Sequence, residues 1–455
     1  MRGKIWALIG LLISGILGYG FFYTWRALPI ATAYSAKIMC SCIFVSEREE
    51  EAIRKKDLSS FEFVDFHINH LERSVEVDFM RAAARKAFYR PGLGCTLASS
   101  KDSLADVTIN KPPPEHSNQR WPTGHLGAIA PYSQNYDQIN LEAALERAFG
   151  EPDPDKLQGT RAVIVIYKGK ILAERYAEEF TKDTPLIGWS MAKSVTNALL
   201  GLLVQNNLLS LDEDHLFPEW SGDDDPRRDI TLDHLLRMTS GLEWDERYSG
   251  LSDATKMLFA QTDAAEMAFS QPLDYPPGGY WEYSSGTSNI LSKLIKNKVG
   301  GTDHQYFNFP HELLFNRIGM RSAIIEPDGS NTFVGSSFMY ATARDWARFG
   351  LLYLNDGVWE GERILPEGWV DYSRSMTPAS DGRYGAHFWL TAGEPKGGAG
   401  LPEDAYHLSG YEGQKVVIIP SYEMVLVRLG FSQPESNWDF TGFVRDILTA
   451  FSPSK

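Results

Sequence analysis

The two ends of this chain carry the same kind of strand pair, and the long stretch between them has the pattern of helices. Residues 161–167 and 171–176 are rich in β-branched and aromatic side chains and flank a short glycine-containing turn, which predicts an antiparallel hairpin. Residues 415–419 and 424–429 predict a second hairpin, whereas residues 190–375 are mainly helical in pattern. We therefore expect an α+β fold, an α/β sandwich in which one antiparallel sheet built from both chain ends packs against a helical region.

The N-terminal segment is long and apolar enough to interact with a membrane. Residues 5–25 contain no charged side chain, and as a helix rising about 1.5 Å per residue they can cross a hydrocarbon core of about 30 Å. Because Arg2 and Lys4 precede this run, we expect a single-pass transmembrane helix in the inner (cell) membrane, with the rest of the chain periplasmic, that is, extracytoplasmic. The alternative is a signal peptide cleaved near residues 31–33, although the run exceeds the ~7–15 residues usual for the apolar part of a signal.

These patterns divide the chain into three parts. Residues 1–26 form the transmembrane anchor or signal segment, and residues 126–455 form the main domain. Residues 27–125 form a small N-terminal region and a connector. The region has a strand pattern at 74–79, and the connector has a proline-rich composition at 111–124.

Charge and cysteine content limit the partners and cofactors. The formal net charge of −15 argues against binding to nucleic acid. In an exported protein, Cys95 can form a disulfide with either Cys40 or Cys42. The chain has no Cys-x-x-Cys pair, and His67 and His70 have no evident third ligand, so we expect neither a metal nor another cofactor.

Ser190 and Lys193 form the motif that most specifically indicates chemistry. Three positions are almost one helical turn, so on a helix predicted for 190–206 the lysine amine can reach the serine hydroxyl and take its proton. The start of that helix also provides backbone N–H groups that favour developing negative charge. The one other Ser-x-x-Lys spacing, Ser452 with Lys455, lies in a short polar tail. The alternative for Ser190 is an ordinary helix N-cap.

Two later segments provide further candidates. Tyr283 follows a Pro/Gly turn and precedes an apolar helix, and a tyrosine near Lys193 can act as a base and then as an acid toward the leaving group. Gly410 allows a strand edge to approach a substrate closely, so the backbone N–H after it can complete an oxyanion hole with that of Ser190. The alternatives are a tyrosine that only packs and an ordinary glycine-rich strand.

Taken in order, these residues resemble the serine β-lactamase and penicillin-binding-protein-like superfamily, in its class C-like branch with 6-aminohexanoate-dimer hydrolases and related esterases. The resemblance covers about residues 140–450 and includes the phrases at 235–242 and 341–350. It implies a β-lactamase/transpeptidase-like fold, with Ser190 as the acylated nucleophile and Lys193 as its activating partner. It also implies Tyr283 as the proton shuttle, and the N–H groups of Ser190 and Tyr411 as oxyanion donors.

The chain departs from the superfamily pattern at two positions. Ser285 replaces the asparagine of Tyr-x-Asn, and Leu408-Ser409-Gly410 stands where β-lactam-binding members have Lys-Thr-Gly. His407 lies one residue out of register, which on a strand points a side chain to the other face. The candidate oxyanion and substrate-binding residues are Tyr411, Gly410, Ser409, Ser285 and His407.

The resemblance implies a serine hydrolase that cleaves an amide or ester bond through an acyl-enzyme. Its expected partners are a small-molecule or short-peptide substrate and the membrane, with no nucleic acid. Loss of the Lys-Thr-Gly lysine, which helps to hold a β-lactam carboxylate, weakens the nearest alternative, a β-lactamase or DD-peptidase. An alternative from another class is a non-catalytic sensor of cell-wall fragments.

Overall fold

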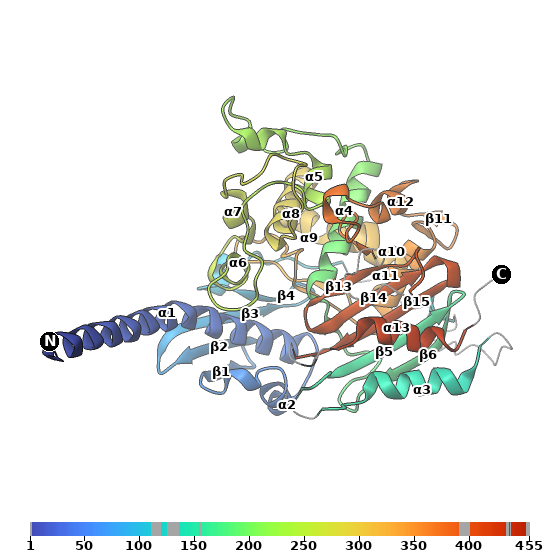
Figure 1. Ribbon diagram of the computed structural model, residues 1–455. Helices are drawn as coiled ribbons and strands as arrows, with labels where there is room; N and C mark the ends of the chain where they lie inside the picture. The colour runs from blue at the N-terminus through green and yellow to red at the C-terminus, as the bar shows by residue number, and fades with distance from the viewer. Residues whose placement is uncertain are drawn as a thin grey trace.

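The computed structural model describes residues 2–110, 120–124, 136–153, 156–390, 401–433, 436 and 438–451 (Figure 1). The Ser452/Lys455 pair and most of the predicted connector at 111–124 lie outside these residues.

The central sheet is antiparallel and unites the two ends of the main domain, which confirms the expectation from the hairpins. It has six strands in the order β12-β13-β14-β15-β5-β6. The two predicted hairpins meet where β15 pairs with β5, for example at Leu426 opposite Val165. The strands are β5 (Thr160–Tyr167), β6 (Lys170–Tyr176), β12 (Trp389–Leu390), β13 (Tyr406–Gly410), β14 (Gln414–Ile419) and β15 (Met424–Gly430).

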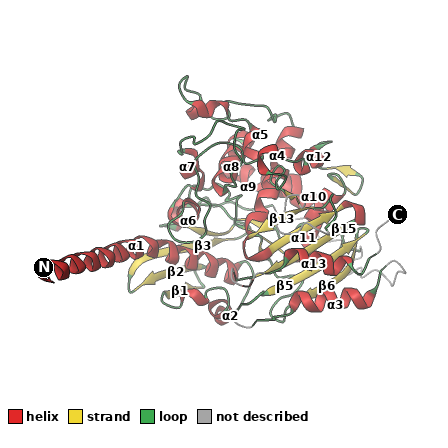
Figure 2. Cartoon of the chain, in the orientation of Figure 1, coloured by secondary structure: helices red, strands yellow, loops and turns green. Residues whose placement is uncertain are grey.

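Helices cover both faces of this sheet (Figure 2). The terminal helices α3 (Gln138–Phe149) and α13 (Phe440–Leu448) pack together and bury an apolar cluster against one face. On the other face, α11 (Ala343–Leu354) contacts β5, β14 and β15, and its Gly350 leaves room for Val425, which would lie 2.6 Å from an added Cβ atom. Alternating strand residues therefore divide between two apolar layers.

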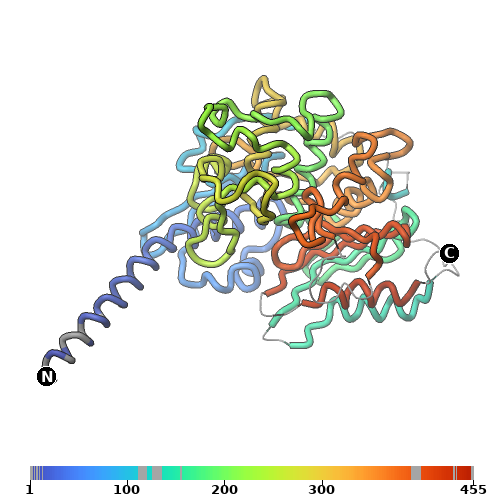
Figure 3. The backbone as a smooth tube through the Cα atoms, turned by 45° about the horizontal axis from the view of Figure 1, so that its top comes forward, coloured from blue at the N-terminus to red at the C-terminus, as the bar shows by residue number. Residues whose placement is uncertain are grey.

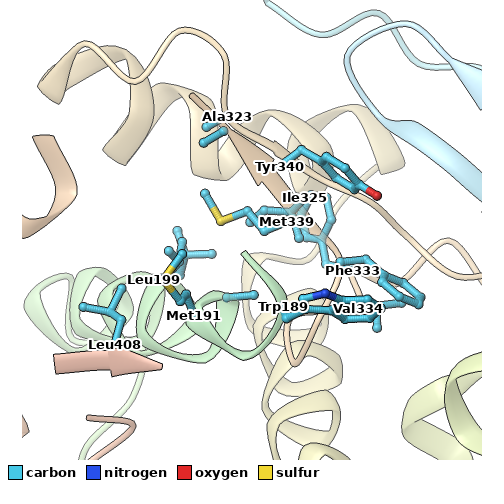
Figure 4. Packing of buried hydrophobic residues seen from close by; sticks show 14 of the residues in the cluster. Trp189, Met191, Leu199, Ala323, Ile325, Phe333, Val334, Met339, Tyr340 and Leu408 are labelled. Atoms are coloured by element: carbon cyan, nitrogen blue, oxygen red, sulfur yellow. The ribbon is translucent and has the colours of Figure 1, made fainter. Parts of the chain in front are cut away.

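The helical region lies beside the α11 face and contains the core shown in Figure 4, where Met191 and Leu199 approach Met339 and Leu408. A small sheet in the order β7-β9-β8 and a β10-β11 hairpin complete this region. Its helices are α4 (Ala192–Gln205), α5 (Leu232–Leu236), α6 (Asp253–Ala260), α7 (Ala264–Phe269), α8 (Ser285–Val299), α9 (Asp303–Pro310), α10 (Asn316–Ile318) and α12 (Trp369–Arg374). Its strands are β7 (Leu186–Ile187), β8 (Ile324–Ile325), β9 (Met339–Ala341), β10 (Val358–Trp359) and β11 (Glu362–Arg363).

The chain opens with a single long helix, α1 (Arg2–Phe44), which projects from the body (Figure 3). Every described side chain from Lys4 to Arg26 is exposed, whereas residues 27–44 are mostly buried. By length and composition, the helix segment Ser14–Phe44 could cross a membrane, which is compatible with a single-pass anchor or a signal peptide. The predicted boundary after residue 26 therefore falls where α1 enters the body, not at a break in the helix.

The inner half of α1 packs on a four-stranded sheet in the order β1-β2-β3-β4. Cys40 forms a disulfide with Cys95 on β4, and Cys42 is free and buried. Residues two apart on a helix point in different directions, so only one of the two candidate cysteines faces the sheet. The remaining elements are α2 (Glu50–Lys55), β1 (Asp65–Asn69), β2 (Ser74–Phe79), β3 (Ala82–Arg90) and β4 (Gly94–Leu97).

Candidate active site

Ser190 lies in a tight turn between the small sheet and α4. Residues Trp189–Met191 form a single 3₁₀ turn, and the α-helix begins at Ala192 rather than at Ser190 as predicted. Trp189 has a left-handed backbone, with φ of 48°, and the preceding Gly188 has no room for a side chain, because a Cβ atom would stand 2.3 Å from the ring of Trp346. The turn thus holds Ser190 almost buried, at 9% exposure.

Lys193 lies beside Ser190 and is fully enclosed. Its Nζ donates to Ser190 Oγ at 3.1 Å, to Ser285 Oγ at 2.9 Å and to the Ser336 carbonyl at 3.0 Å. These neutral acceptors occupy the three donor directions of an ammonium group. Burial lowers the pKa of Lys193 from 10.5 to about 8, and the more distant charge of Glu246 opposes that shift. A neutral amine is therefore accessible near neutral pH, as a general base requires.

Tyr283 lies beside Lys193 in the group around Ser190. The Lys193 ammonium lies 4.9 Å from the centroid of its ring, and the ring packs against Trp389 at 5.2 Å and Tyr384 at 5.9 Å. Burial, assisted by Glu246, raises the pKa of Tyr283 well above its ordinary value, and a hydrogen bond with Ser190 only partly opposes this. The phenol therefore stays protonated and can pass a proton on without existing as a free phenolate.

Glu246 is a residue of the site that sequence reasoning missed. Its Oε1 accepts from Ser285 Oγ at 2.5 Å and from the Tyr248 hydroxyl at 2.5 Å. Its Oε2 accepts from the Ser285 backbone N–H at 2.7 Å and from Trp244 Nε1 at 2.6 Å. Ser285 thus accepts from Lys193 and donates to Glu246, which places one hydroxyl between the buried amine and the carboxylate. Glu246 follows the phrase at 235–242 by only four positions, but no spacing rule marks it.

The strand β13 lies close to the turn that carries Ser190, with Gly410 against Gly188. A Cβ atom there would stand 2.1 Å from the Gly188 carbonyl oxygen, so a larger residue would push β13 away. Tyr411 follows at once in a 3₁₀ turn (Tyr411–Gly413), and its ring meets that of Trp189 edge-on at 5.8 Å. These contacts place Tyr411 beside the turn that carries Ser190, and its role as an oxyanion donor stays a prediction.

Ser409 and His407 are not brought to Ser190. Ser409 accepts a hydrogen bond from Lys415 at 2.9 Å, and the Lys415 ammonium lies over the ring of Phe440 on α13. His407 packs on the same Phe440 ring at 4.8 Å, is fully buried and has no hydrogen-bond partner for either ring nitrogen among the described residues. Burial lowers its pKa well below the ordinary value. Alternation along the strand places both side chains on the α13 face, away from the nucleophile.

A buried histidine closer to the site is structural. His387 Nδ1 pairs with the Leu236 carbonyl at 2.7 Å, and Nε2 lies 2.9 Å from Ser288 Oγ. Burial lowers its pKa to about 3, so it remains neutral. No group of three or more His, Cys, Asp and Glu side chains in the described part of the chain is arranged to hold a metal ion.

Comparisons with known proteins agree with this geometry. The family described as Beta-lactamase matches residues 155–439. The 6-aminohexanoate-dimer hydrolase of Paenarthrobacter ureafaciens is 23% identical in an alignment 359 positions long, and the match covers 69% of this chain and 86% of that protein.

Solved structures share the fold. A candidate 6-aminohexanoate-dimer hydrolase from Bacillus anthracis has a TM-score of 0.56 at 20% identity and covers 89% of this chain and 96% of its own. A family VIII carboxylesterase has a TM-score of 0.53 at 15% identity, covering 69% of this chain and 96% of its own.

Proposed function

Because the chain belongs to the Beta-lactamase family and is a serine hydrolase of the amidase and esterase type, we propose that Ser190 is its nucleophile. On this proposal, the protein cleaves an amide or ester bond through an acyl-enzyme on Ser190. The observation that carries the proposal is the buried Lys193 amine, 3.1 Å from Ser190 Oγ, with its pKa lowered to about 8. An amine held in this state can accept the serine proton at near-neutral pH.

In the first step, Ser190 Oγ bonds to the substrate carbonyl carbon while Lys193 takes the hydroxyl proton. The carbonyl oxygen becomes an oxyanion facing the N–H groups of Ser190 and Tyr411. The new ammonium keeps the Ser285 hydroxyl and Ser336 carbonyl as acceptors, and Ser285 connects it to the carboxylate of Glu246. The network therefore stabilises the charge that forms on Lys193.

In the second step, the bond to the leaving group breaks and the acyl group stays on Ser190. The proton on Lys193 passes by way of the Tyr283 phenol to the departing nitrogen or oxygen, and Tyr283 is protonated before and after the transfer. Water then attacks the acyl carbon and gives its proton to Lys193. The acid leaves as Ser190 regains its hydrogen.

The test is intact-mass analysis of the full-length protein treated with a fluorophosphonate and with p-nitrophenyl esters. We expect one added phosphonyl group, located on Ser190 by peptide mapping and absent from Ser190→Ala. Labelling at another serine, or ester hydrolysis that persists in Ser190→Ala, would show that a different group is the nucleophile. Absence of both labelling and turnover would favour the non-catalytic alternative.

A β-lactamase or DD-peptidase activity receives no support from the strand that lines the site. Leu408, at the position of the lysine of Lys-Thr-Gly, is apolar and fully buried. The nearby Lys415 ammonium points to the α13 face. The described strand therefore offers no cation for a β-lactam carboxylate beside Ser190.

We also propose that α1 stays attached as a single-pass anchor with the body in the periplasm. Cleavage near residues 31–33 would cut through the helix at Thr32 and Ala33, which are fully buried, and would leave Cys40 on a short stub. The Cys40–Cys95 disulfide fits an oxidising compartment. The substrate is proposed to be small, without nucleic acid as a partner.

A further inference from the structure

A cavity of about 640 Å³ lies between helix α1 and the candidate active site. It is lined by Ala27, Ile30, Ala31 and Tyr34 of α1 and by Leu258 and Phe259 of α6. Its volume is that of a small-molecule site, and most of these walls are apolar. We call this cavity the α1 groove.

The outer end of the α1 groove lies where α1 leaves the body. Trp25 is 57% exposed, whereas Leu28 is 7% exposed, so the helix passes from an exposed to a buried environment within one turn. Figure 1 shows the exposed half projecting from this point, beside α6. Tyr23 and Trp25 are residues that favour a membrane surface. If the exposed half is the anchor, the groove opens at the surface of the bilayer.

The inner end of the α1 groove is lined by residues that adjoin the candidate active site. Trp189, which precedes Ser190, and Tyr411, the predicted oxyanion donor, both line it. Tyr248 also lines it, with its ring 5.3 Å from that of Tyr411 and its hydroxyl 3.2 Å from Ser285 Oγ. Trp189, Tyr248 and Tyr411 therefore connect the groove to the residues around Ser190, which itself is not among the lining residues.

The loop that carries Tyr248 also contacts the anchor helix directly. Gly250 lies against the Tyr23 hydroxyl, which would stand 2.2 Å from an added Cβ atom. The carboxylates in the groove wall have partners within the protein: Asp57 pairs with Arg48 and Arg161, and Glu412 accepts from Trp189 Nε1. Helix α1 and this loop therefore form adjoining parts of the groove wall. The described lining residues include no lysine or arginine that could bind a negatively charged substrate.

We propose that the substrate is an acyl ester or amide of a bilayer lipid, whose aliphatic acyl chain lies in the α1 groove with its carbonyl at Ser190. This inference rests on the proposed acyl-enzyme function. Ser190 takes the acyl group, the alcohol or amine of the lipid leaves with the proton, and water releases a fatty acid. Delivery from the membrane explains why the groove shares a wall with the anchor helix.

The experiment measures chain-length preference with full-length protein in phosphatidylethanolamine/phosphatidylglycerol vesicles, using p-nitrophenyl acetate, butyrate, octanoate and laurate. Each added methylene is expected to raise kcat/KM up to about fourfold until the groove is full, because burying one methylene supplies about 0.8 kcal/mol. The protein is also expected to release fatty acid from the vesicle lipid itself. A flat chain-length profile, or laurate hydrolysis without release of fatty acid from the vesicles, would overturn the proposal.

Ala31→Trp fills the α1 groove from the helix side, and Ala27→Trp fills its outer end. Both are expected to lower laurate kcat/KM more than tenfold, with acetate hydrolysis and fluorophosphonate labelling of Ser190 within twofold of the wild-type values. Gly18→Trp, on the exposed half of α1 with no atom within 4 Å of its added Cβ, is the matched control. Equal losses on both esters would show a structural defect and count against the groove. Failure of acetate hydrolysis in the wild type would instead overturn the proposed function.

Discussion

Two lysines in this protein are equally buried, and their surroundings differ in one respect. Lys37 and Lys193 are each 1% exposed. Lys37 Nζ pairs directly with the carboxylate of Glu326 and donates to Ser41 at 3.2 Å. Lys193 Nζ instead donates to two hydroxyl oxygens and a carbonyl oxygen, and the carboxylate of Glu246 lies beyond Ser285. Burial lowers the pKa of both amines, but only Lys37 has a direct counter-ion to favour its charge.

Under the proposed mechanism, this difference separates a structural cation, Lys37, from a base, Lys193. The Lys37–Glu326 pair joins the inner half of α1 to the main domain, and Glu326 also accepts from Ser41 Oγ at 2.8 Å and the Cys95 N–H at 2.6 Å. At Lys193, the Ser285 hydroxyl lies between the amine and the Glu246 carboxylate, so the carboxylate does not bind the ammonium directly and the amine can lose its proton more easily. Removing Lys193 should therefore lower activity and raise stability, whereas removing Lys37 should lower stability and leave the activity of the folded protein unchanged.

The largest effect is expected for Lys193→Met. Loss of the base should lower kcat/KM for an ester by about 10⁴-fold or more. The same change should raise the free energy of unfolding at pH 7 by roughly 1–3 kcal/mol, because a buried ammonium no longer has to be desolvated. Ester hydrolysis and denaturant unfolding of the full-length protein measure the two quantities. Retained activity would show that Lys193 is not the base.

The pKa shift of Lys193 also predicts the pH dependence of that stability difference. The folded state binds fewer protons than the unfolded state between about pH 8 and 10.5, so wild-type stability should rise with pH in that window. The advantage of Lys193→Met should shrink over the same interval. A constant difference across it would contradict the lowered pKa.

Lys37→Met is expected to lower the stability of the protein without changing its catalytic rate. An unpaired Glu326 carboxylate would remain buried, which typically costs about 3–5 kcal/mol of unfolding free energy. The folded fraction should keep its kcat/KM. Adding Glu326→Gln removes the stranded charge and should recover part of the loss. A large fall in turnover with unchanged stability would remove the distinction between the two lysines.

Tyr283→Phe is expected to lower kcat/KM by about 10²- to 10³-fold, because the leaving group loses its proton donor. Tyr384→Phe is the matched control, since it alters a phenol in the same ring cluster, 5.9 Å from the Tyr283 ring. Rates with p-nitrophenyl esters, whose leaving group needs little protonation, should fall less than rates with alkyl amides. Equal losses for both variants would indicate a packing role.

The smallest effect is expected for Glu246→Gln. The Glu246 charge raises the pKa of Lys193, so its loss should lower that pKa further. Activity requires the neutral amine, and the rising limb of the kcat/KM–pH profile should therefore move from about pH 8 to a lower value by roughly one unit or less. Glu243→Gln, an exposed change on the same loop, should leave the limb in place. A shift to higher pH would contradict the proposed electrostatics.

Predictions from short spacings and strand patterns agree with the structure. Ser190 and Lys193 are three residues apart, so almost any helical turn brings them together, even though the first turn is 3₁₀ rather than α. The β-branched and aromatic residues in the segments on either side of the helical region also predicted the two hairpins. His407 was a candidate substrate-binding residue, but its position one residue out of register predicted a side chain on the other face of β13, and its ring does pack there against Phe440.

The amino-acid sequence by itself determined the closeness of Ser190 and Lys193, the antiparallel hairpins and the apolar N-terminal run, because each depends on residues a few positions apart. Only the tertiary structure decided that Ser285 connects Lys193 to Glu246, that Cys40 rather than Cys42 pairs with Cys95, and that α1 lines a groove together with Trp189 and Tyr411. These contacts join residues distant in the chain, and no local periodicity records which distant side chains meet once the core has packed.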